Sequence, residues 1–260
     1  MQNRHQNREQ YFFELASTSE KYYIPFISKV IPVNEHTQVL EIGCGEGGNL
    51  VPFTLKGCKV TGVDMATIRI EQAREIFKKK GYKGTLIAED IFKLKELENL
   101  FDLIIIHDVI EHIDNKEAFL AKIRLYLKPG GVVFIGFPAW QMPFGGHQQI
   151  CSSRFASKAP FIHLFPGRLY AFLLKCCSEK DVTIQELLEI KQTRCSIERF
   201  IKAVKKAQFS IVLHQLYFIN PHYEIKFGLK PRKLSPVIGG IPYLRNFFCT
   251  SCFYIIKPTS

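Results

Sequence analysis

The stretch from Val39 to Gly48 constrains the fold of this chain more than any other part of the sequence. A short apolar run, Val-Leu-Glu-Ile, leads directly into a cluster of glycines. A strand that runs into glycines and then into a helix lets the backbone approach a ligand closely at the helix N-terminus. Read as G-x-G-x-x-G over Gly43, Gly45 and Gly48, the stretch also fits a dinucleotide-binding fingerprint. A tight strand-to-helix turn without a ligand is a third interpretation.

Short apolar runs and amphipathic segments alternate after this turn, which is typical of a parallel sheet covered by helices. We expect strands at 38–42, 59–63, 85–88, 101–106, 132–137, 209–219 and 247–256. We expect the main helices at 48–56, at 66–80, after an N-cap at Asp114, and around 197–204. The predicted fold class is α/β, a Rossmann-like, doubly wound, mostly parallel seven-stranded sheet with an antiparallel C-terminal hairpin.

The chain of 260 residues, 47% of them hydrophobic, can bury one substantial core, so we expect a single domain over residues 1–260. Residues 1–37 should form an N-terminal helical cap that breaks near Pro25. Residues 138–195 interrupt the strand–helix rhythm with glycines, aromatics and two expected helices, 167–177 and 182–192. We interpret this segment as a helical insertion that lies over the carboxyl edge of the sheet as a substrate lid.

Other features of the sequence favour a cytoplasmic protein without a transmembrane segment. The first ten residues are polar and contain no apolar signal region. The apolar stretch Val237–Ile256 contains Pro242 and Arg245, so we expect a loop and a buried strand there. The eight cysteines show no disulfide framework, and we expect reduced thiols. Cys249 and Cys252 should lie on opposite faces of the last strand, which argues against a metal or redox role.

Charge is distributed unevenly along the chain. Acidic and basic residues balance up to residue 130, so the formal net charge of +11 falls entirely in the second half. A basic half can face an anionic substrate, nucleic acid or a membrane surface, or be an ordinary solvated surface.

A second motif, Val-Thr-Gly-Val-Asp, ends the next expected strand at Asp64. An acid about 20 residues past the second glycine is suited to hydrogen bonding both ribose hydroxyls of a nucleotide. Dinucleotide-binding proteins share this feature too. Later segments of the sequence are therefore needed to distinguish a dinucleotide-binding site from a site for another ligand.

Taken in order, five segments resemble the class I S-adenosylmethionine-dependent methyltransferases over about residues 38–137. Glu41–Gly47 is similar to the first motif of that family, and Asp64 to its ribose-binding acid. The remaining three are Ala-Glu-Asp-Ile at 88–91, Phe-Asp-Leu-Ile-Ile-Ile-His-Asp at 101–108, and Leu-Lys-Pro-Gly-Gly at 127–131. Dinucleotide enzymes do not usually combine all five, and the chain has no Tyr-x-x-x-Lys proton relay after Asp64.

The resemblance implies S-adenosylmethionine as the cofactor and assigns roles to individual residues. Glu41 would take the ammonium group, Asp64 the ribose and Asp90 the adenine amino group. The full set of implied cofactor-binding residues is Glu41, Gly43, Gly45, Asp64, Met65, Asp90, Ile91 and His107. Positioning of the methyl group in line with the acceptor would supply most of the rate.

Asp108-Val-Ile-Glu111-His112 narrows the resemblance to the E-x-x-E-H segment of ubiquinone-pathway O-methyltransferases and small-RNA 2′-O-methyltransferases, with Asp at the first position. In such families the cluster can hold a divalent cation, so Asp108, Glu111 and His112 form an alternative metal site, with His147 as a further ligand. We prefer the metal-independent interpretation, in which Glu111 and His112 anchor the turn. His112 and His147 are the candidate general bases, and His147 is equally read as an ordinary loop histidine.

We therefore expect methyl transfer to a small-molecule or lipid- or glycan-like acceptor, with oxygen as the methylated atom. The alternatives are an RNA 2′-O-methyltransferase, a cofactor-binding regulatory protein without catalysis, and a dinucleotide-dependent oxidoreductase. The small-molecule partner is preferred over nucleic acid.

Overall fold

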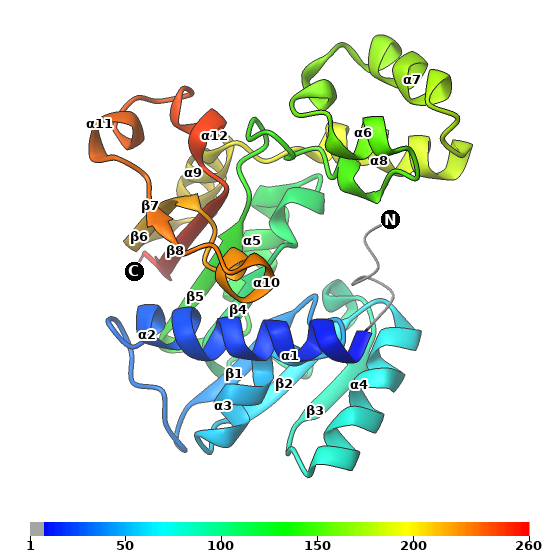
Figure 1. Ribbon diagram of the computed structural model, residues 1–260. Helices are drawn as coiled ribbons and strands as arrows, with labels where there is room; N and C mark the ends of the chain where they lie inside the picture. Colours follow the sequence, from blue (N-terminus) through cyan, green and yellow to red (C-terminus); the bar gives the residue numbers. More distant parts are fainter. Residues whose placement is uncertain (1–7, 260) are drawn as a thin grey trace.

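The computed structural model describes residues 8–259 and arranges their strands in one twisted sheet (Figure 1). The strand order is β3-β2-β1-β4-β5-β8-β6-β7. The strands are β1 Gln38–Ile42, β2 Lys59–Asp64, β3 Thr85–Ala88, β4 Phe101–His107, β5 Leu127–Phe137, β6 Phe209–Ile219, β7 Arg232–Lys233 and β8 Ser251–Pro258. The first five are parallel, and β8 runs antiparallel between β5 and β6. The doubly wound α/β architecture with an antiparallel C-terminal pair is confirmed.

The sheet has eight strands among the described residues, where the sequence predicted seven. The additional strand, β7, is only two residues long and pairs with the edge of β6. Both of its side chains are exposed, so no apolar alternation marked it in the sequence.

Helices cover both faces of the sheet. Those up to the insertion are α1 Arg8–Thr18, α2 Ile24–Ile27, α3 Val51–Leu55, α4 Thr67–Lys80 and α5 Lys116–Arg124. Those from the insertion onward are α6 Arg154–Lys158, α7 Gly167–Cys176, α8 Asp181–Thr193, α9 Ile197–Lys206, α10 His222–Phe227, α11 Pro236–Gly239 and α12 Arg245–Phe248.

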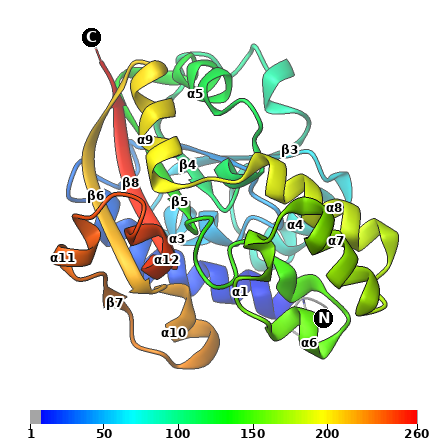
Figure 2. The ribbon, with the colours of Figure 1, turned by 90° about the horizontal axis from the view of Figure 1, so that it is seen from above.

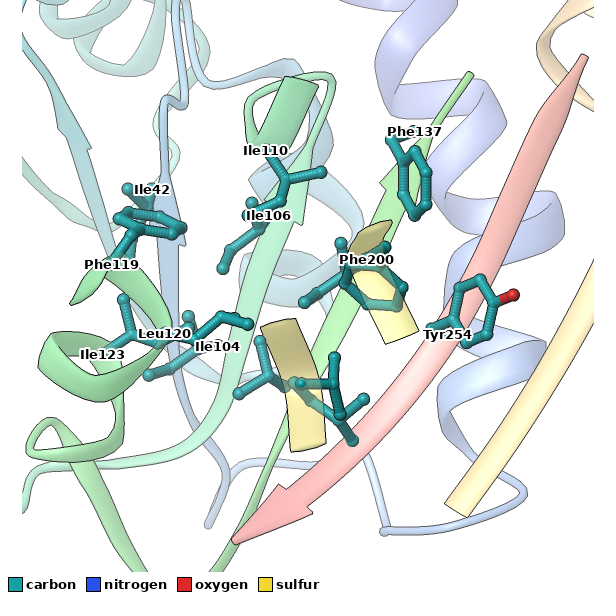
Figure 3. Close-up of a cluster of buried hydrophobic side chains, with 14 of the residues drawn as sticks. Ile42, Ile104, Ile106, Ile110, Phe119, Leu120, Ile123, Phe137, Phe200 and Tyr254 are labelled. Atoms are coloured by element: carbon teal, nitrogen blue, oxygen red, sulfur yellow. The ribbon is translucent and has the colours of Figure 1, made fainter. Parts of the chain in front are cut away.

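Strand β4 divides the core in two, because its side chains alternate between the faces of the sheet. Ile104 and Ile106 pack with α5 and α9, and Figure 3 shows them beside Phe119, Leu120 and Phe200. Leu103 and Ile105 lie in a second buried cluster together with side chains of α1 to α4. Burial on both faces explains why this strand is apolar at nearly every position.

The described part of the N-terminal cap is a helix with one irregular turn. A π-helical turn, Ser19–Tyr23, joins α1 directly to α2, and Pro25, which has no N–H to donate, is the second residue of α2, immediately after this turn. The predicted break near Pro25 is therefore a change of helix type just before it. Residues 1–7 of the expected cap lie outside the described residues.

The segment expected as an insertion contains α6, α7 and α8, above the carboxyl ends of the parallel strands (Figures 1 and 2). It has a small core of its own, to which Tyr170, Leu174 and Leu187 contribute. Its two ends meet, because the Trp140 N–H donates to the Cys195 carbonyl at 2.9 Å.

Several local predictions were wrong. Asn115, not Asp114, caps α5, since its side chain accepts from the Ala118 N–H at 2.9 Å. β5 begins five residues early, because Leu127 pairs with Phe101 ahead of the glycines.

The last strand also differs from its prediction. Part of the apolar run forms α12, so β8 begins at Ser251 and Cys249 precedes it in an irregular segment. The prediction that Cys249 and Cys252 lie on opposite faces fails, since their sulfurs are 3.4 Å apart. No helix within residues 8–259 is long and apolar enough to cross a bilayer.

Candidate functional site

The glycine turn after β1 has a backbone that only glycine adopts easily. Gly43, Gly45 and Gly47 have φ angles of 72°, 53° and 80°. A Cβ atom at Gly43 would lie 2.3 Å from Cγ2 of Val109, so a side chain cannot fit there. The turn thus brings backbone without side chains at Gly43, Gly45 and Gly47 to the carboxyl edge of the sheet, between β1 and the short 3₁₀ turn Gly48–Leu50.

Asp64, at the end of β2, holds this turn in place. One carboxylate oxygen accepts from the Gly45 N–H and the other from the Ala66 N–H, both at 2.8 Å. Met65 follows with 74% of its surface exposed, leaving an uncovered apolar side chain beside the acid. The sequence-predicted acid and glycine are therefore in direct contact.

Glu41 has a buried carboxyl group with one unpartnered oxygen. Oε1 accepts from Asn49 Nδ2 at 2.7 Å, whereas Oε2 has no hydrogen-bond partner among the described residues. Burial raises the pKa of Glu41 to about 8, against the lowering effect of the Asn49 hydrogen bond. An arriving cation would satisfy this oxygen, so the site fits an ammonium group.

The predicted adenine-binding residues lie one strand further along the edge. Asp90 caps a short 3₁₀ turn, with its side chain accepting from the Phe92 N–H at 3.0 Å. The side chain of Ile91 is buried in the core, so only the backbone of this residue can line an open site.

His107 ends β4 and has both ring nitrogens engaged. Nε2 lies 2.7 Å from the hydroxyl of Tyr23, and Nδ1 lies 3.4 Å from a carboxylate oxygen of Asp108. The ring packs over Gly136 of β5, where a Cβ atom would come within 2.6 Å of it. The N-terminal helical segment is thereby tied to the end of the central strand.

Asp108 is a strained residue at the centre of the edge. Its φ angle of 53° is unfavourable for any residue that has a Cβ atom, and such strain is concentrated at functional sites. Its carboxylate is half exposed.

Seven titratable side chains around Asp108, all within residues 8–259, feel its charge. Burial is the largest cause of the pKa shift of each of them, and the charge of Asp108 raises the pKa of each. We call these side chains the Asp108 cluster: Tyr11, Tyr23, Glu111, His112, His147, His222 and Tyr223.

Three members of the cluster could hold a metal ion. One ligand atom from each of Glu111, His112 and His147 lies within 4.8 Å of the others, and the two rings meet edge to face at 5.0 Å. Both oxygens of buried Glu111 lack a hydrogen-bond partner among the described residues. Asp108, which the sequence predicted as a ligand, lies outside this group of three. The structure places His147 beside Glu111 and His112 instead.

His147 reaches this position through two tightly packed glycines. A Cβ atom at Gly145 would lie 2.1 Å from the Trp140 carbonyl, and one at Gly146 would lie 2.2 Å from Cβ of His163. His147 itself has a φ angle of 58°. Burial, followed by the charge of His112, lowers the pKa of His147 to about 4.

A family model described as a methyltransferase domain matches residues 33–194 of the chain, from just before β1 to the end of the insertion. The chain belongs to this methyltransferase family. It is of the class I, S-adenosylmethionine-dependent type, as the five sequence motifs predicted, and S-adenosylmethionine is its cofactor.

Curated relatives of this methyltransferase include ubiquinone biosynthesis O-methyltransferases. That of Rickettsia canadensis (strain McKiel) is 33% identical over 98 residues, which are 38% of this chain and 41% of the relative. That of Rickettsia prowazekii (strain Madrid E) is 35% identical over 100 residues, 38% of each chain. The match thus spans about two fifths of the relatives' length.

Solved structures of other methyltransferases share the fold. An S-adenosylmethionine-dependent methyltransferase from Clostridium acetobutylicum superimposes with a TM-score of 0.56 at 14% identity, over 94% of this chain and 92% of that one. Geranyl diphosphate methyltransferase in complex with S-adenosylmethionine gives a TM-score of 0.56 at 14% identity, over 94% and 85%.

Sequence reasoning missed four members of the methyltransferase's Asp108 cluster. Tyr11 and Tyr23 come from the N-terminal helical segment, and His222 and Tyr223 come from α10, far along the chain. None of them belongs to a motif. The only sequence signal was the concentration of aromatic residues between Tyr11 and Ile31.

Proposed function

We propose that this enzyme transfers the methyl group of S-adenosylmethionine to a hydroxyl oxygen of a small organic molecule. The observation that carries the proposal is the Asp108 cluster, which lies next to the glycine turn and offers several uncharged imidazoles as proton acceptors. The naming of the relatives as O-methyltransferases supports oxygen as the methylated atom.

The residues around the glycine turn would position the cofactor. The Glu41 carboxylate would take its ammonium group, Asp64 the ribose hydroxyls, and Asp90 with the Ile91 backbone the adenine. Bound in this way, S-adenosylmethionine supplies an electrophilic methyl group on a sulfonium sulfur. Gly43 and Gly45 would let the chain pass close to it, and His107 would lie near its amino-acid end.

The acceptor would bind between the Asp108 cluster and residues 138–195, which we propose to act as its lid. A cavity of about 500 Å³ between His112 and α8 supports this location. Its lining includes the acidic side chains of Asp114, Glu186 and Glu189. A wall of carboxylates repels phosphate groups, which favours an uncharged or cationic acceptor over RNA.

A hydroxyl is a poor nucleophile until its proton is removed or its pKa is lowered. His112 and His147 are the candidate bases predicted from the sequence. Glu111, His112 and His147 also fit a divalent cation, which would lower the pKa of the bound hydroxyl. In either case the acceptor oxygen would lie beside the Asp108 cluster, facing the methyl group.

A methyl-transfer assay tests this function. The protein is incubated with S-adenosylmethionine labelled with tritium in the methyl group, together with phenols and catechols with and without an alkyl chain, and separately with a short RNA. We expect label in an alkali-stable methyl ether, none in RNA, and weaker labelling in Asp64→Ala when S-adenosylmethionine is not saturating.

Three outcomes would contradict the proposal. Label in an ester or amine would exclude a hydroxyl acceptor, and label in RNA would favour the 2′-O-methyltransferase alternative. S-adenosylhomocysteine binding without transfer to any acceptor would indicate a regulatory cofactor-binding protein.

A further inference from the structure

His222 is a partly buried histidine in a part of the chain that no motif marked. It is the first residue of α10, in the connection between β6 and β7, and α10 packs against α1 (Figure 1). Its ring meets the ring of Tyr11 edge to face at 6.3 Å. Two helices from opposite ends of the chain therefore enclose one imidazole.

The hydrogen bonds around His222 determine which ring nitrogen bears the proton. The Thr18 hydroxyl donates to the Glu14 carbonyl at 2.8 Å, as helical threonines often do. A hydroxyl has one proton, so toward His222 Nδ1, at 2.9 Å, the same oxygen can only accept. Nδ1 therefore carries the hydrogen, and the lone pair of the neutral ring is on Nε2.

Nε2 of His222 has no hydrogen-bond partner among residues 8–259, although it is buried. Buried polar atoms in native proteins are nearly always paired, and an unpaired one calls for an explanation such as a ligand or a catalytic role. His107 differs, since both of its ring nitrogens are engaged.

His222 also belongs electrostatically to the reaction site. Burial, then the charge of His107, lowers its pKa to about 4, and Lys226 acts in the same direction. Asp108 opposes them and would stabilise a protonated ring. The imidazole is thus uncharged at neutral pH and has a carboxylate close enough to favour the imidazolium.

We propose that His222 is the general base that removes the proton of the acceptor hydroxyl; this rests on the proposed O-methyl transfer. Nε2 takes the proton, and the oxygen electron pair forms the new C–O bond. The C–S bond breaks with its electron pair going to sulfur, which leaves neutral S-adenosylhomocysteine. The imidazolium then returns its proton to solvent. Access of the hydroxyl to Nε2 requires a side-chain movement within the Asp108 cluster.

His222→Asn separates this role from a structural one. The amide nitrogen of asparagine occupies the place of Nδ1 and can still donate to Thr18, but no atom replaces Nε2. With the phenol or catechol methylated best by the wild type, we expect turnover to fall about 10²- to 10⁴-fold. Affinity for S-adenosylhomocysteine should stay within about twofold. The exposed His36→Asn is the matched control and should be fully active.

The pH profile gives a second readout. Below the pKa of the acceptor, the variant's turnover should rise about tenfold per pH unit, because an acceptor that ionises in water needs no base. The groups that act on His222 itself are His107, Asp108 and Lys226. Turnover of His222→Asn within threefold of wild type, or a variant profile parallel to that of wild type, would overturn the proposal.

An NMR measurement tests the same residue without any acceptor. In protein labelled with ¹⁵N at histidine, long-range ¹H–¹⁵N correlation should show His222 as a neutral ring with hydrogen on Nδ1 from pH 6 to 8. A hydrogen on Nε2, or a charged ring in this range, would overturn the assignment. If this spectrum is as expected but the wild type methylates no hydroxyl, the proposed function is wrong, whereas the assignment of the hydrogen to Nδ1 of His222 remains valid.

Discussion

Glu41 shows how a single residue links burial to cofactor binding. Glu41 is 1% exposed, and one of its carboxylate oxygens lacks a hydrogen-bond partner among the described residues. Burial disfavours the ionised form, so in the free protein the group keeps its proton at neutral pH. A bound ammonium group would reverse this preference, which couples the affinity for the cofactor to pH.

We predict that affinity for S-adenosylhomocysteine increases between pH 6 and 8, by up to about tenfold per unit. The pKa of Glu41 is about 8 in the free protein and should fall well below this in the complex, so binding releases a proton. Calorimetry at three pH values, in buffers of different ionisation enthalpy, measures both effects.

Glu41→Gln is the control, because its amide cannot ionise and should remove the protein's share of the proton release. If the wild type and this variant show the same pH dependence, Glu41 does not contact the ammonium group. The free energy of unfolding of the unliganded wild type should also decrease as pH rises from about 4.5 to 8, since the folded pKa is the higher one.

The contacts in the candidate site that sequence could predict are those between residues that are close in the chain or at the ends of neighbouring strands. Gly45 and Asp64 could be paired because parallel strands bring their carboxyl ends to one edge. Tyr23 and His222 could not be found, because their contacts with His107 and Thr18 join segments far apart. Only tertiary packing, which leaves no local pattern, puts them in the site.

At the scale of whole elements, the periodic segments were predictable and the irregular ones were not. β4 was recognised from its apolar composition, and the helices expected at 167–177 and 182–192 correspond to α7 and α8. The start of β8 was misplaced because an apolar run has the same composition in α12 as in a strand. There Asn246 accepts from the Ile197 N–H at 2.8 Å, a distant contact that holds α12 in place.

The insertion is anchored at its far end by the ammonium group of Lys116. This buried group donates to the carbonyls of Ile113 and Thr193, at 2.6 and 2.7 Å. The contact joins the end of α8 to the turn that contains His112. The insertion is thus connected to the site through Lys116 at its end and through His147, while Tyr170, Leu174 and Leu187 form its own small core.

We predict that replacing residues 145–191 by a short glycine–serine linker abolishes methyl transfer but preserves S-adenosylhomocysteine binding. The linker can close the gap because Trp140 and Cys195 are already hydrogen bonded, and every predicted cofactor-binding residue precedes residue 138. Calorimetry and the tritium assay on the same preparation measure the two properties. A folded variant that no longer binds would mean that the insertion belongs to the cofactor site.

At the scale of the whole molecule, the two halves of the chain differ in charge and in task. The electrically balanced first half contains the motifs assigned to the cofactor, and the half with the whole net charge of +11 contains most of the proposed acceptor-binding surface. The cavity next to His112 is nevertheless lined by the acidic side chains of Asp114, Glu186 and Glu189, whereas Arg168, Lys191 and Arg194 line a second cavity between α7 and α8. Net charge alone therefore did not identify the acceptor.

The most direct test of a cofactor site built on the glycine turn is calorimetric titration with S-adenosylhomocysteine, with NAD as the comparison ligand. The wild type should bind one S-adenosylhomocysteine per chain and no NAD. Asp64→Ala should bind about tenfold to a hundredfold more weakly, because a hydrogen bond to a charged group contributes about 1.5–3 kcal/mol. Binding of NAD in place of S-adenosylhomocysteine, or an unchanged affinity in a folded Asp64→Ala protein, would contradict the account.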